Sequence, residues 1–402
     1  MKPVLVVGAS VGGSTAANTL AQAGVPVILL ERDLSWVKPC GGALPPVAFD
    51  EFDIPHRLIS RKVRTAEIHS PTERTTAIRV AGLKDRPNDF VAMACREDLD
   101  PFLRGRAVQN GAQLIEGKLT DLTVDDDGVT VAYTAKADGS KQSLRVEAVI
   151  GADGAYSTVA KLLGLERLPY CTAIQERIAL PPSQMERWHD TAALYLGPDV
   201  SPDLYAWVFP KEDHVAVGLG AGPGKAKEVR QLLTNLKERV AHDLQGGEIM
   251  MEEAYALPIH PRKRMAFDRV MLVGDAAGLV AATSGEGIYW AMKSAQRAAQ
   301  TLIEHLPDAS HAVLRQYERA WWRDYGTMYR FLQWLQKWGY GNARQMEVFT
   351  DMCRNNDVQQ LTFESYMYKE MTPVPWLAQM RMTGDILGAQ IRHYWPRRVF
   401  AG

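Results

Sequence analysis

Three turns in the chain place small residues directly after a short apolar run, and two of them add an aspartate. The turns are GASVGG (8–13), GADG (151–154) and VGDAAG (273–278). Small residues let backbone N–H groups approach a phosphate closely, and a helix that starts there adds its positive N-terminus. We therefore predict that the first turn holds the pyrophosphate of a dinucleotide.

The first turn departs from the dinucleotide fingerprint at one position. Gly8 is expected to make the tight turn and Gly13 to let helix pack on strand, but position 10 is Ser10 instead of a second glycine. Glu31 ends the next apolar run, where a carboxylate accepts hydrogen bonds from ribose hydroxyls. An acid there disfavours a phosphate on that ribose, which favours FAD or NAD over NADP. The alternative is a glycine turn in a nucleotide-free α/β protein.

The stretch SWVKPCGGALPP (35–46) places a cysteine and a glycine pair just after the second predicted strand. Gly41 and Gly42 have no side chains, so their backbone can approach a flat ring without a clash. Cys40 has two interpretations, which both stand. It is either a small thiol beside the site that can donate a proton, or a space-filling core cysteine.

The hydrophobic pattern predicts the elements that position these motifs. Residues 4–30 read as strand, helix and strand, with the helix over 14–23, and form one βαβ unit. Residues 64–80 and 112–150 alternate polar and apolar types around turn sequences, which predicts antiparallel hairpins. Further elements are expected as strands at 191–197, 204–209 and 214–219, a helix at 284–306, and an aromatic-rich helix that begins near Tyr317.

Pieces of βαβ pattern lie on both sides of a β-rich middle, so the predicted fold class is α/β with a discontinuous dinucleotide domain. A Rossmann-like FAD-binding domain is predicted over 1–60, 95–170 and 265–306. An antiparallel β-sheet substrate domain is predicted over 61–94 and 171–264, and an aromatic-rich helical C-terminal region over 307–402.

Composition excludes several classes of function. The chain has 402 residues and a formal net charge of -1, which gives no overall field to attract nucleic acid. Its four cysteines are scattered without metal-ligand spacing, so we expect reduced thiols and no metal. No apolar run reaches the length of a membrane span without a charge. The expected location is cytoplasmic, with at most peripheral contact to a membrane.

The stretch TSGEGIYWAMKS (283–294) is expected to open the helix after Asp275. Ser284 can cap this helix, while Gly285 and Gly287 leave its first amides bare. A bare helix N-terminus is electropositive and would stabilise an anionic reduced flavin placed against it. Ordinary helix capping is the alternative.

Together with Arg96 in CREDLDPFL, the three turns resemble the FAD contacts of the para-hydroxybenzoate-hydroxylase-like flavoproteins. That resemblance implies that Asp275 binds the ribityl chain and that Arg96 lies near the ribityl and pyrophosphate groups. Within this fold, KPCGGALPP, YAWVFPKEDHVAVGLG and SGEGIYWAMKS resemble the geranylgeranyl reductases of chlorophyll and bacteriochlorophyll synthesis. The resemblance covers nearly the whole chain and extends over Phe349–Lys369.

The resemblance implies an FAD-dependent enzyme that reduces isolated C=C bonds of a geranylgeranyl group to phytyl. Hydride would come from flavin N5, with NADPH or reduced ferredoxin as transient electron donor. The implied partners are a prenylated tetrapyrrole or geranylgeranyl diphosphate, and contact with chlorophyll synthase or the photosynthetic membrane. Three alternatives remain open: an FAD-dependent aromatic monooxygenase, a reductase of another prenyl substrate such as a quinone side chain or an archaeal-type lipid, and a non-catalytic flavoprotein that binds a prenyl pigment.

The alternating rings of Tyr205, Trp207 and Phe209 share one face of a strand. They fit a plain sheet core, or the wall of an apolar tunnel that stabilises cation-like charge. The candidates for the proton donor are Cys40, Tyr289 and an ordered water. The residues expected at the catalytic site are Cys40, Gly41, Gly42, Tyr205, Trp207 and Tyr289. The residues expected to bind the cofactor are Gly8, Ser10, Gly12, Gly13, Glu31, Arg32, Lys38, Arg96, Asp153, Gly154, Gly274, Asp275, Gly278, Gly285 and Gly287.

Overall fold

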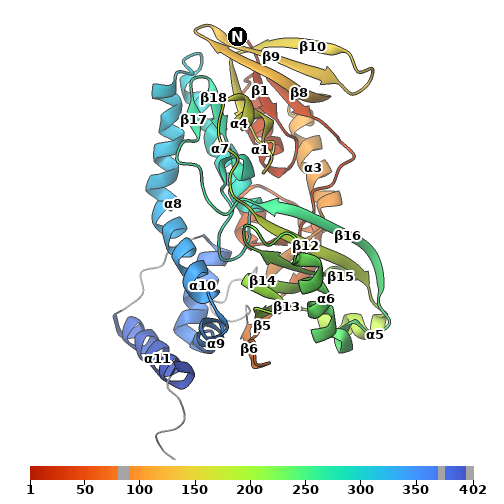
Figure 1. The fold of residues 1–402 in the computed structure, drawn as a ribbon. Helices are drawn as coiled ribbons and strands as arrows, with labels where there is room; N and C mark the ends of the chain where they lie inside the picture. Colours follow the sequence, from red (N-terminus) through yellow and green to blue (C-terminus); the bar gives the residue numbers. More distant parts are fainter. Residues whose placement is uncertain (80–89, 370–375, 395–402) are drawn as a thin grey trace, which may run out of the picture. The chain divides into compact units, whose positions relative to one another are not determined.

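The computed structural model describes residues 1–79, 90–369 and 376–394. The chain divides into two compact units, each assembled from three separate stretches (Figure 1). Unit 1 comprises residues 1–38, 96–170 and 256–331, and unit 2 comprises residues 39–95, 171–255 and 332–402. The functional domains predicted from the sequence stay a prediction. Two of their ranges, 61–94 and 307–402, include positions outside the described residues.

Unit 1 contains an eight-stranded sheet and the helices that pack beside it. Its strands are β1 (Val4–Val7), β2 (Val27–Glu31), β8 (Gln113–Asp125), β9 (Gly128–Ala135), β10 (Lys141–Val146), β11 (Ala148–Gly151), β17 (Ala266–Phe267) and β18 (Val270–Leu272). Its helices are α1 (Val11–Gln22), α3 (Arg96–Gln109), α4 (Thr158–Leu162), the 3₁₀ turn η4 (Gly274–Ala277), α7 (Ile288–His305) and the part of α8 (His311–Gly339) up to residue 331.

The order of this sheet is β10-β9-β8-β2-β1-β11-β18-β17. From β8 to β18 the neighbouring strands are parallel, and β1, β11 and β18 are buried along their whole length. Such continuous apolar runs are typical of a parallel sheet covered on both faces. The turns that follow β1, β11 and β18 are the three small-residue turns of the sequence, and they lie at the carboxyl ends of neighbouring strands. Ligands bind at this edge in open α/β sheets.

Unit 2 contains a seven-stranded sheet of order β16-β12-β15-β14-β13-β5-β6 and a smaller sheet of order β3-β7-β4. The strands are β3 (Ala43–Leu44), β4 (Ile59–Val63), β5 (Thr65–His69), β6 (Thr75–Arg79), β7 (Val91–Ala94), β12 (Cys171–Ala179), β13 (Thr191–Gly197), β14 (Ser201–Pro210), β15 (His214–Ala221) and β16 (Glu248–Leu257). The helices are α2 (Pro46–Glu51), η1 (His56–Leu58), α5 (Pro182–Met185), η2 (Glu186–Trp188), α6 (Val229–Arg239), η3 (Ala241–Leu244), α9 (Ala343–Met352), α10 (Asn356–Met367) and α11 (Trp376–Tyr394).

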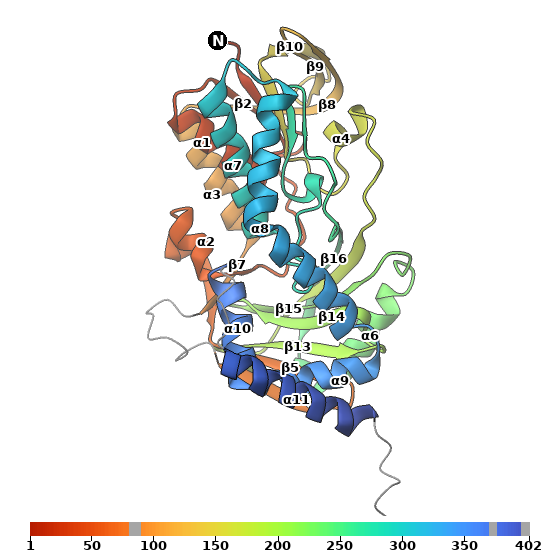
Figure 2. The same ribbon diagram turned by 90° about the vertical axis from the view of Figure 1, so that its left-hand side faces the viewer.

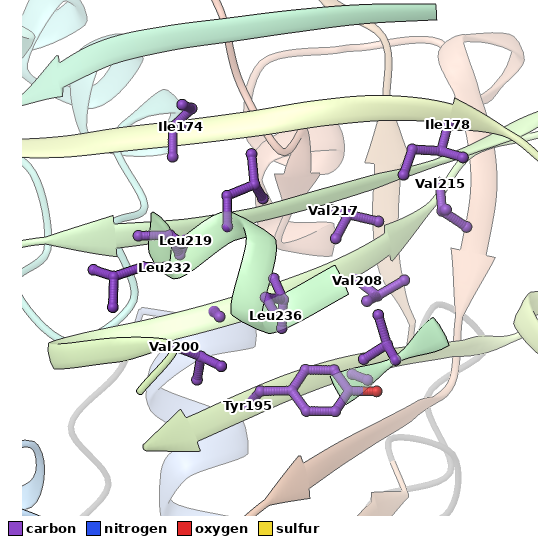
Figure 3. Close-up of a cluster of buried hydrophobic side chains, with 14 of the residues drawn as sticks. Ile174, Ile178, Tyr195, Val200, Val208, Val215, Val217, Leu219, Leu232 and Leu236 are labelled. Carbon is purple, nitrogen blue, oxygen red and sulfur yellow. The ribbon is translucent and has the colours of Figure 1, made fainter. Parts of the chain in front are cut away.

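One face of the seven-stranded sheet packs against α6 and forms an apolar core (Figure 3). Strand residues Val208 and Val217 meet Leu232 and Leu236 of the amphipathic helix α6, and all four side chains are buried. Burying side chains of this kind stabilises the fold by about 1.5–3 kcal/mol each. Because side chains alternate along a strand, the neighbours of Val208 in β14 face away from this core.

Helix α9 packs against strands β6 and β13, and helix α11 packs against α9 (Figure 2). An ion cluster joins both helices to the β5–β6 hairpin. The Arg74 guanidinium bonds both Glu347 and Asp351 of α9, and His393 Nε2 of α11 lies 2.8 Å from Asp351 Oδ2. Burial opposes ionisation of both carboxylates. The hydrogen bonds from Arg74, Thr72 and His393 outweigh it and hold the pKa of each carboxyl below its usual range.

We expect Arg74→Met to destabilise the protein at neutral pH by about 3 kcal/mol, because it removes the guanidinium that pairs with two buried carboxylates. A lowered pKa in the folded state gives stability that is present above the unfolded value and lost as the pH falls through the folded value. The difference between wild type and variant should therefore shrink below about pH 4. Chemical denaturation at a series of pH values measures the free energy of unfolding of both proteins. A difference that does not change with pH would contradict stabilisation by the Arg74 ion pairs.

Most predicted elements are confirmed, and three helix starts are corrected. The strand at 191–197 and the hairpins at 64–79 and 112–150 are present, while Val80 lies outside the described residues. The first helix begins at Val11 instead of residue 14, and α8 begins at His311 instead of near Tyr317. The helix expected from residue 284 begins at Ile288, because Gly285 has a left-handed φ of +61° that an α-helix cannot contain.

Candidate active site

The glycine turn after β1 has the backbone roles that the sequence predicts. Gly8 has a φ of +97°, and a Cβ there would lie 2.5 Å from the carbonyl oxygen of Ala152. A Cβ at Gly13 would lie 1.6 Å from the carbonyl oxygen of Gly8. A Cβ at Gly12 would lie 3.2 Å from the carbonyl oxygen of Ala291 in α7. The turn is therefore closed from both sides by protein backbone, and its binding of a pyrophosphate stays a prediction.

Ser10 has a function that a second glycine would lack. The Arg96 guanidinium donates to Ser10 Oγ at 2.7 Å and to both oxygens of Asp100 at 2.7 Å. Ser10 Oγ also lies 3.1 Å from Asp100 Oδ2. Arg96 is 3 % exposed, so its charge is neutralised inside the protein and its direction is fixed. Sequence reasoning missed Asp100, although the spacing of four residues in REDLD is a signal for a helical ion pair.

The carboxylate of Glu31 braces the same turn. Its Oε2 accepts from the Ala9 N–H at 2.7 Å, and its Oε1 accepts from the Asp33 N–H at 3.1 Å. Glu31 keeps partial exposure, as a ribose-binding carboxylate requires. Arg32 is exposed, with its guanidinium 5.5 Å from the centre of the Trp36 ring. Contact of Glu31 or Arg32 with a cofactor stays a prediction.

Asp153 has a structural task in the second turn. Its carboxylate accepts from the Ser157 hydroxyl at 2.6 Å and from the Thr158 and Val159 N–H groups at 2.6 and 3.0 Å. Burial raises the pKa of this carboxyl, while these hydrogen bonds favour the ionised form. Asp153 thus anchors the start of α4, and Gly154 beside it has a left-handed φ of +81°. Their contact with a cofactor stays a prediction.

The third turn brings two predicted cofactor residues together. Lys38 Nζ lies 2.5 Å from Asp275 Oδ2, and the Asp275 side chain is 5 % exposed. Small residues surround this turn, since a Cβ at Gly274 would lie 2.9 Å from the Ala291 Cβ and one at Gly287 would lie 3.4 Å from Asp275 Oδ1. Of the remaining glycines expected here, Gly278 has a left-handed φ of +75°.

The expected cap of α7 is wrong. The N-cap is Gly287, and Glu286 instead supplies the capping carboxylate, which accepts from the Tyr289 N–H at 2.8 Å. Ser284 Oγ accepts from the Glu286 N–H at 3.4 Å. The first turn of α7 is therefore not bare, and a negative charge offsets part of its dipole. Tyr289 is 3 % exposed and its ring lies edge-on to Trp290, with centres 5.0 Å apart.

The Cys40–Gly42 loop packs on the seven-stranded sheet within unit 2. The carbonyl of Cys40 accepts from Gln175 Nε2 at 3.1 Å, and the carbonyl of Gly41 accepts from Lys211 Nζ at 2.7 Å. Gly42 donates its N–H to Cys40 Sγ at 3.3 Å. Gln175 lies in none of the sequence motifs. Lys211 lies in the stretch YAWVFPKEDHVAVGLG, which was noted only for its resemblance to the reductase family. Both are functional candidates that sequence reasoning missed.

The glycine pair is required by the protein itself. A Cβ at Gly41 would lie 2.9 Å from the Phe209 ring, and one at Gly42 would lie 2.1 Å from the Ala94 carbonyl oxygen. Gly42 also has a φ of +72°. The predicted close approach to a flat ring therefore stays a prediction, because contacts inside unit 2 already account for both glycines.

We expect Gly42→Ala to displace the Cys40–Gly42 loop and to reduce turnover at least tenfold, while FAD stays bound through residues of unit 1. The strain arises from the left-handed φ and from the overlap with the Ala94 carbonyl. Flavin absorbance of the purified variant and its turnover with the prenyl substrate that the sequence resemblance implies measure the two effects. Gly139→Ala is the matched control, since Gly139 has a φ of +70° but no atom near its Cβ position. Unchanged turnover in Gly42→Ala would contradict a role of the loop.

The structure confirms that the aromatic side chains of β14 share one face of the strand. The rings of Tyr205 and Trp207 have centres 5.9 Å apart, and those of Trp207 and Phe209 are stacked with centres 5.9 Å apart. Ala206 and Val208, which alternate with them, belong to the core against α6. The three rings thus lie on the sheet face that also carries the Cys40–Gly42 loop.

Comparison with known proteins shows the family. Residues 1–321 match a family model described as "FAD binding domain". The chain is 42% identical over 402 residues, 97% of its length and 98% of the relative's, to a protein of Synechocystis sp. named geranylgeranyl diphosphate reductase. It is 39% identical to the chloroplastic geranylgeranyl diphosphate reductase of Arabidopsis thaliana, over 98% of this chain and 86% of that protein. The chain belongs to the geranylgeranyl diphosphate reductase family.

A solved structure supports the fold assignment. The geranylgeranyl bacteriochlorophyll reductase-like protein of Thermoplasma acidophilum superposes with a TM-score of 0.77 at 23% identity, over 98% of this chain and 96% of that one. Membership of the geranylgeranyl diphosphate reductase family confirms the predicted α/β FAD-binding fold, FAD as the cofactor and an enzymatic, oxidoreductase role. Among the described residues, none of the helices is long and apolar enough to cross a membrane, and no cluster of side chains suits a metal ion.

Proposed function

We propose that this geranylgeranyl diphosphate reductase family member reduces the isolated double bonds of a geranylgeranyl group, carried either by a diphosphate or by a (bacterio)chlorophyll pigment. The observation that carries the proposal is the aromatic face of β14, where Tyr205, Trp207 and Phe209 lie beside the Cys40–Gly42 loop. A row of rings offers a long apolar surface without charges, which suits a hydrocarbon chain. The names of the relatives support the same substrate class.

The residues of unit 1 fit FAD. The turn at Gly8 and Gly13 lies too close to backbone carbonyls to admit a Cβ, so it keeps a bare backbone, and Ser10 fixes the buried guanidinium of Arg96 next to it. Glu31 would bind the ribose, Arg96 would face the phosphates, and Asp275 with Lys38 would hold the ribityl region. When bound and reduced, FAD supplies a hydrogen with its electron pair.

The chain's own residues would then bind the alkene and exclude water. An isolated alkene has no neighbouring carbonyl, so its transition state is expected to develop positive charge as one carbon takes up a proton. The faces of Tyr205 and Trp207 can stabilise such charge by cation–π attraction, which strengthens in a dry site. Because several double bonds react in turn, the prenyl group must slide along the aromatic face of β14. Flat rings without interlocking side chains permit that movement.

The electron donor and the location are part of the same proposal. The sequence carries one dinucleotide fingerprint, at residues 8–13, so NADPH or reduced ferredoxin would visit the flavin only transiently. Peripheral contact with the photosynthetic membrane or with chlorophyll synthase is supported by Trp334, which is 56% exposed and stacks on Trp338 with ring centres 5.8 Å apart. Exposed tryptophans are favoured at membrane interfaces.

Anaerobic turnover tests the proposal. The flavin is reduced, geranylgeranyl diphosphate or the geranylgeranyl ester of chlorophyllide or bacteriochlorophyllide is added, and the product mass is measured. Stepwise gain of hydrogen pairs with reoxidation of the flavin is expected, and the better substrate identifies the carrier. Incorporation of an oxygen atom in air, without anaerobic reaction, would show an aromatic-type monooxygenase instead. Tight binding of the prenyl pigment without any reaction would show a non-catalytic carrier.

A further inference from the structure

Two buried polar atoms of opposite kind lack a hydrogen-bond partner among the described residues of unit 2. They are the indole Nε1 of Trp207, a donor, and the amide Oε1 of Gln175, an acceptor. Trp207 is 8% exposed and Gln175 is 3% exposed. A buried polar group left unpaired costs about 1–3 kcal/mol, so a small ligand that bonds both atoms would stabilise the fold.

The two side chains converge on one place. Gln175 of β12 and Trp207 of β14 are the cross-strand neighbours of Gly218 in β15, one on each side. A Cβ at Gly218 would lie 2.6 Å from the Gln175 Cβ and 2.6 Å from the Trp207 ring atom Cζ2. Because Gly218 has no side chain, the side chains of Gln175 and Trp207 can both lie over its position in the sheet.

The loop of Cys40 and Gly41 covers this spot. Gln175 Nε2 donates to the Cys40 carbonyl at 3.1 Å and to Glu253 Oε1 at 2.6 Å, which fixes the amide so that Oε1 is the free end. The position of a Cβ at Gly41 lies 3.6 Å from Trp207 Nε1. The donor and the acceptor thus both border the Cys40–Gly42 loop, which lies beside the aromatic face where the proposed function places the prenyl group.

Other buried indoles do not share this arrangement. Trp321 also lacks a partner for Nε1 among the described residues, but it packs edge-on against the Trp290 ring, and aromatic rings accept weak N–H bonds. The Trp290 ring packs edge-on against Tyr325 as well. Trp188 lies in the core against α6. In the described part of the chain, the pairing of an unbonded donor with a neighbouring unbonded acceptor occurs at Trp207 and Gln175.

We propose that Trp207 Nε1–H and Gln175 Oε1 bind one water molecule, and that this water donates the proton of the reduction. The inference rests on the proposed function. Water is the small ligand that accepts one hydrogen bond and donates another at once, and buried waters are held by such polar groups. With the indole N–H on its oxygen and one hydrogen on Gln175, its second hydrogen is free for the substrate.

The step balances as follows. One alkene carbon receives hydrogen with its electron pair from the reduced cofactor, and the other carbon takes the free proton of the water. The π bond supplies the electrons of this second C–H bond, and hydroxide remains. The Lys211 ammonium, 3% exposed and bonded to the Gly41 carbonyl at 2.7 Å, is placed to return a proton to it. As ligands of the water, Gln175 and the Trp207 indole N–H are positioning groups, whereas the face of the Trp207 ring keeps its proposed contact with the substrate.

A crystal structure of the substrate-free holoprotein tests the binding step alone. In the wild type we expect density for one water within hydrogen-bond distance of both Trp207 Nε1 and Gln175 Oε1. In Trp207→Phe we expect this density to be absent. Absence of water between these atoms in the wild type would overturn the proposal. The crystal structure does not depend on turnover, so it shows whether the water is bound even if the proposed function itself fails.

Anaerobic single-turnover kinetics test the proton step. Trp207→Phe should slow reoxidation of the reduced flavin by the prenyl substrate at least about tenfold, leave reduction of the flavin unchanged and increase the solvent deuterium isotope effect on reoxidation. Trp188→Phe is the matched control, since it removes an unbonded indole N–H from the core of the same unit. Reoxidation of Trp207→Phe at the wild-type rate, or with an unchanged isotope effect, would overturn the proposal. If the wild type itself does not react with any geranylgeranyl substrate, the proposed function fails instead.

Discussion

Gly13→Ala is expected to yield a protein that is insoluble or free of FAD. The added Cβ would lie 1.6 Å from the Gly8 carbonyl oxygen and 3.3 Å from the Ala152 Cβ. The first of these is a backbone atom of the turn itself, so no side-chain rotation relieves the overlap. Either α1 moves away from β1 or the turn opens. Overpacking of this kind costs about 1–3 kcal/mol when the surroundings can adjust, and more when they cannot.

The measurement compares thermal unfolding and flavin content of the variant with those of Gly105→Ala. Gly105 lies within α3 and has no atom within 4 Å of its Cβ position. Alanine there should stabilise the helix by about 0.5–1 kcal/mol. The two substitutions are chemically identical, so opposite shifts in melting temperature isolate the effect of the close approach. Wild-type stability and flavin content in Gly13→Ala would refute the packing role of this glycine.

The parts of the molecule that follow from local rules were predictable. The apolar run 4–7, the glycine turn and the following helix specify a βαβ unit because each feature needs only neighbours in sequence. The aromatic face of β14 was predictable for the same reason, since alternation along one strand fixes the shared face of Tyr205, Trp207 and Phe209.

The parts that depend on distant contacts were not predictable. Ser10 looked like an imperfect glycine because its partner Arg96 is 86 residues away in the chain. Gln175 and Lys211 bond the carbonyls of Cys40 and Gly41 across 135 and 170 residues, and no spacing in the sequence signals such pairs.

The start of α7 was missed for a local but ambiguous reason. Several residues in SGEG can cap a helix, and the sequence does not say which of its glycines takes a left-handed φ. The structure gives that conformation to Gly285 and the capping carboxylate to Glu286.

Arg96→Leu is expected to have the second large effect, on both stability and FAD affinity. Arg96 is 3% exposed and bonds both carboxylate oxygens of Asp100, whose side chain is 11% exposed. Removing the guanidinium leaves a buried carboxylate without its cation, which costs about 3–5 kcal/mol. The same change removes the cation that we expect to face the phosphates of FAD.

A double variant separates the two losses. Replacing both charges, in Arg96→Leu with Asp100→Leu, removes the unpaired carboxylate, and such swaps for apolar residues are often nearly neutral for stability. The double variant should therefore recover most of the melting temperature, yet still bind FAD at least tenfold more weakly than wild type by titration of the apoprotein. Recovery of FAD affinity together with stability would show that Arg96 serves folding only. Persistent loss of affinity in a stable protein would instead place its charge at the cofactor, with Ser10 as the residue that aims it.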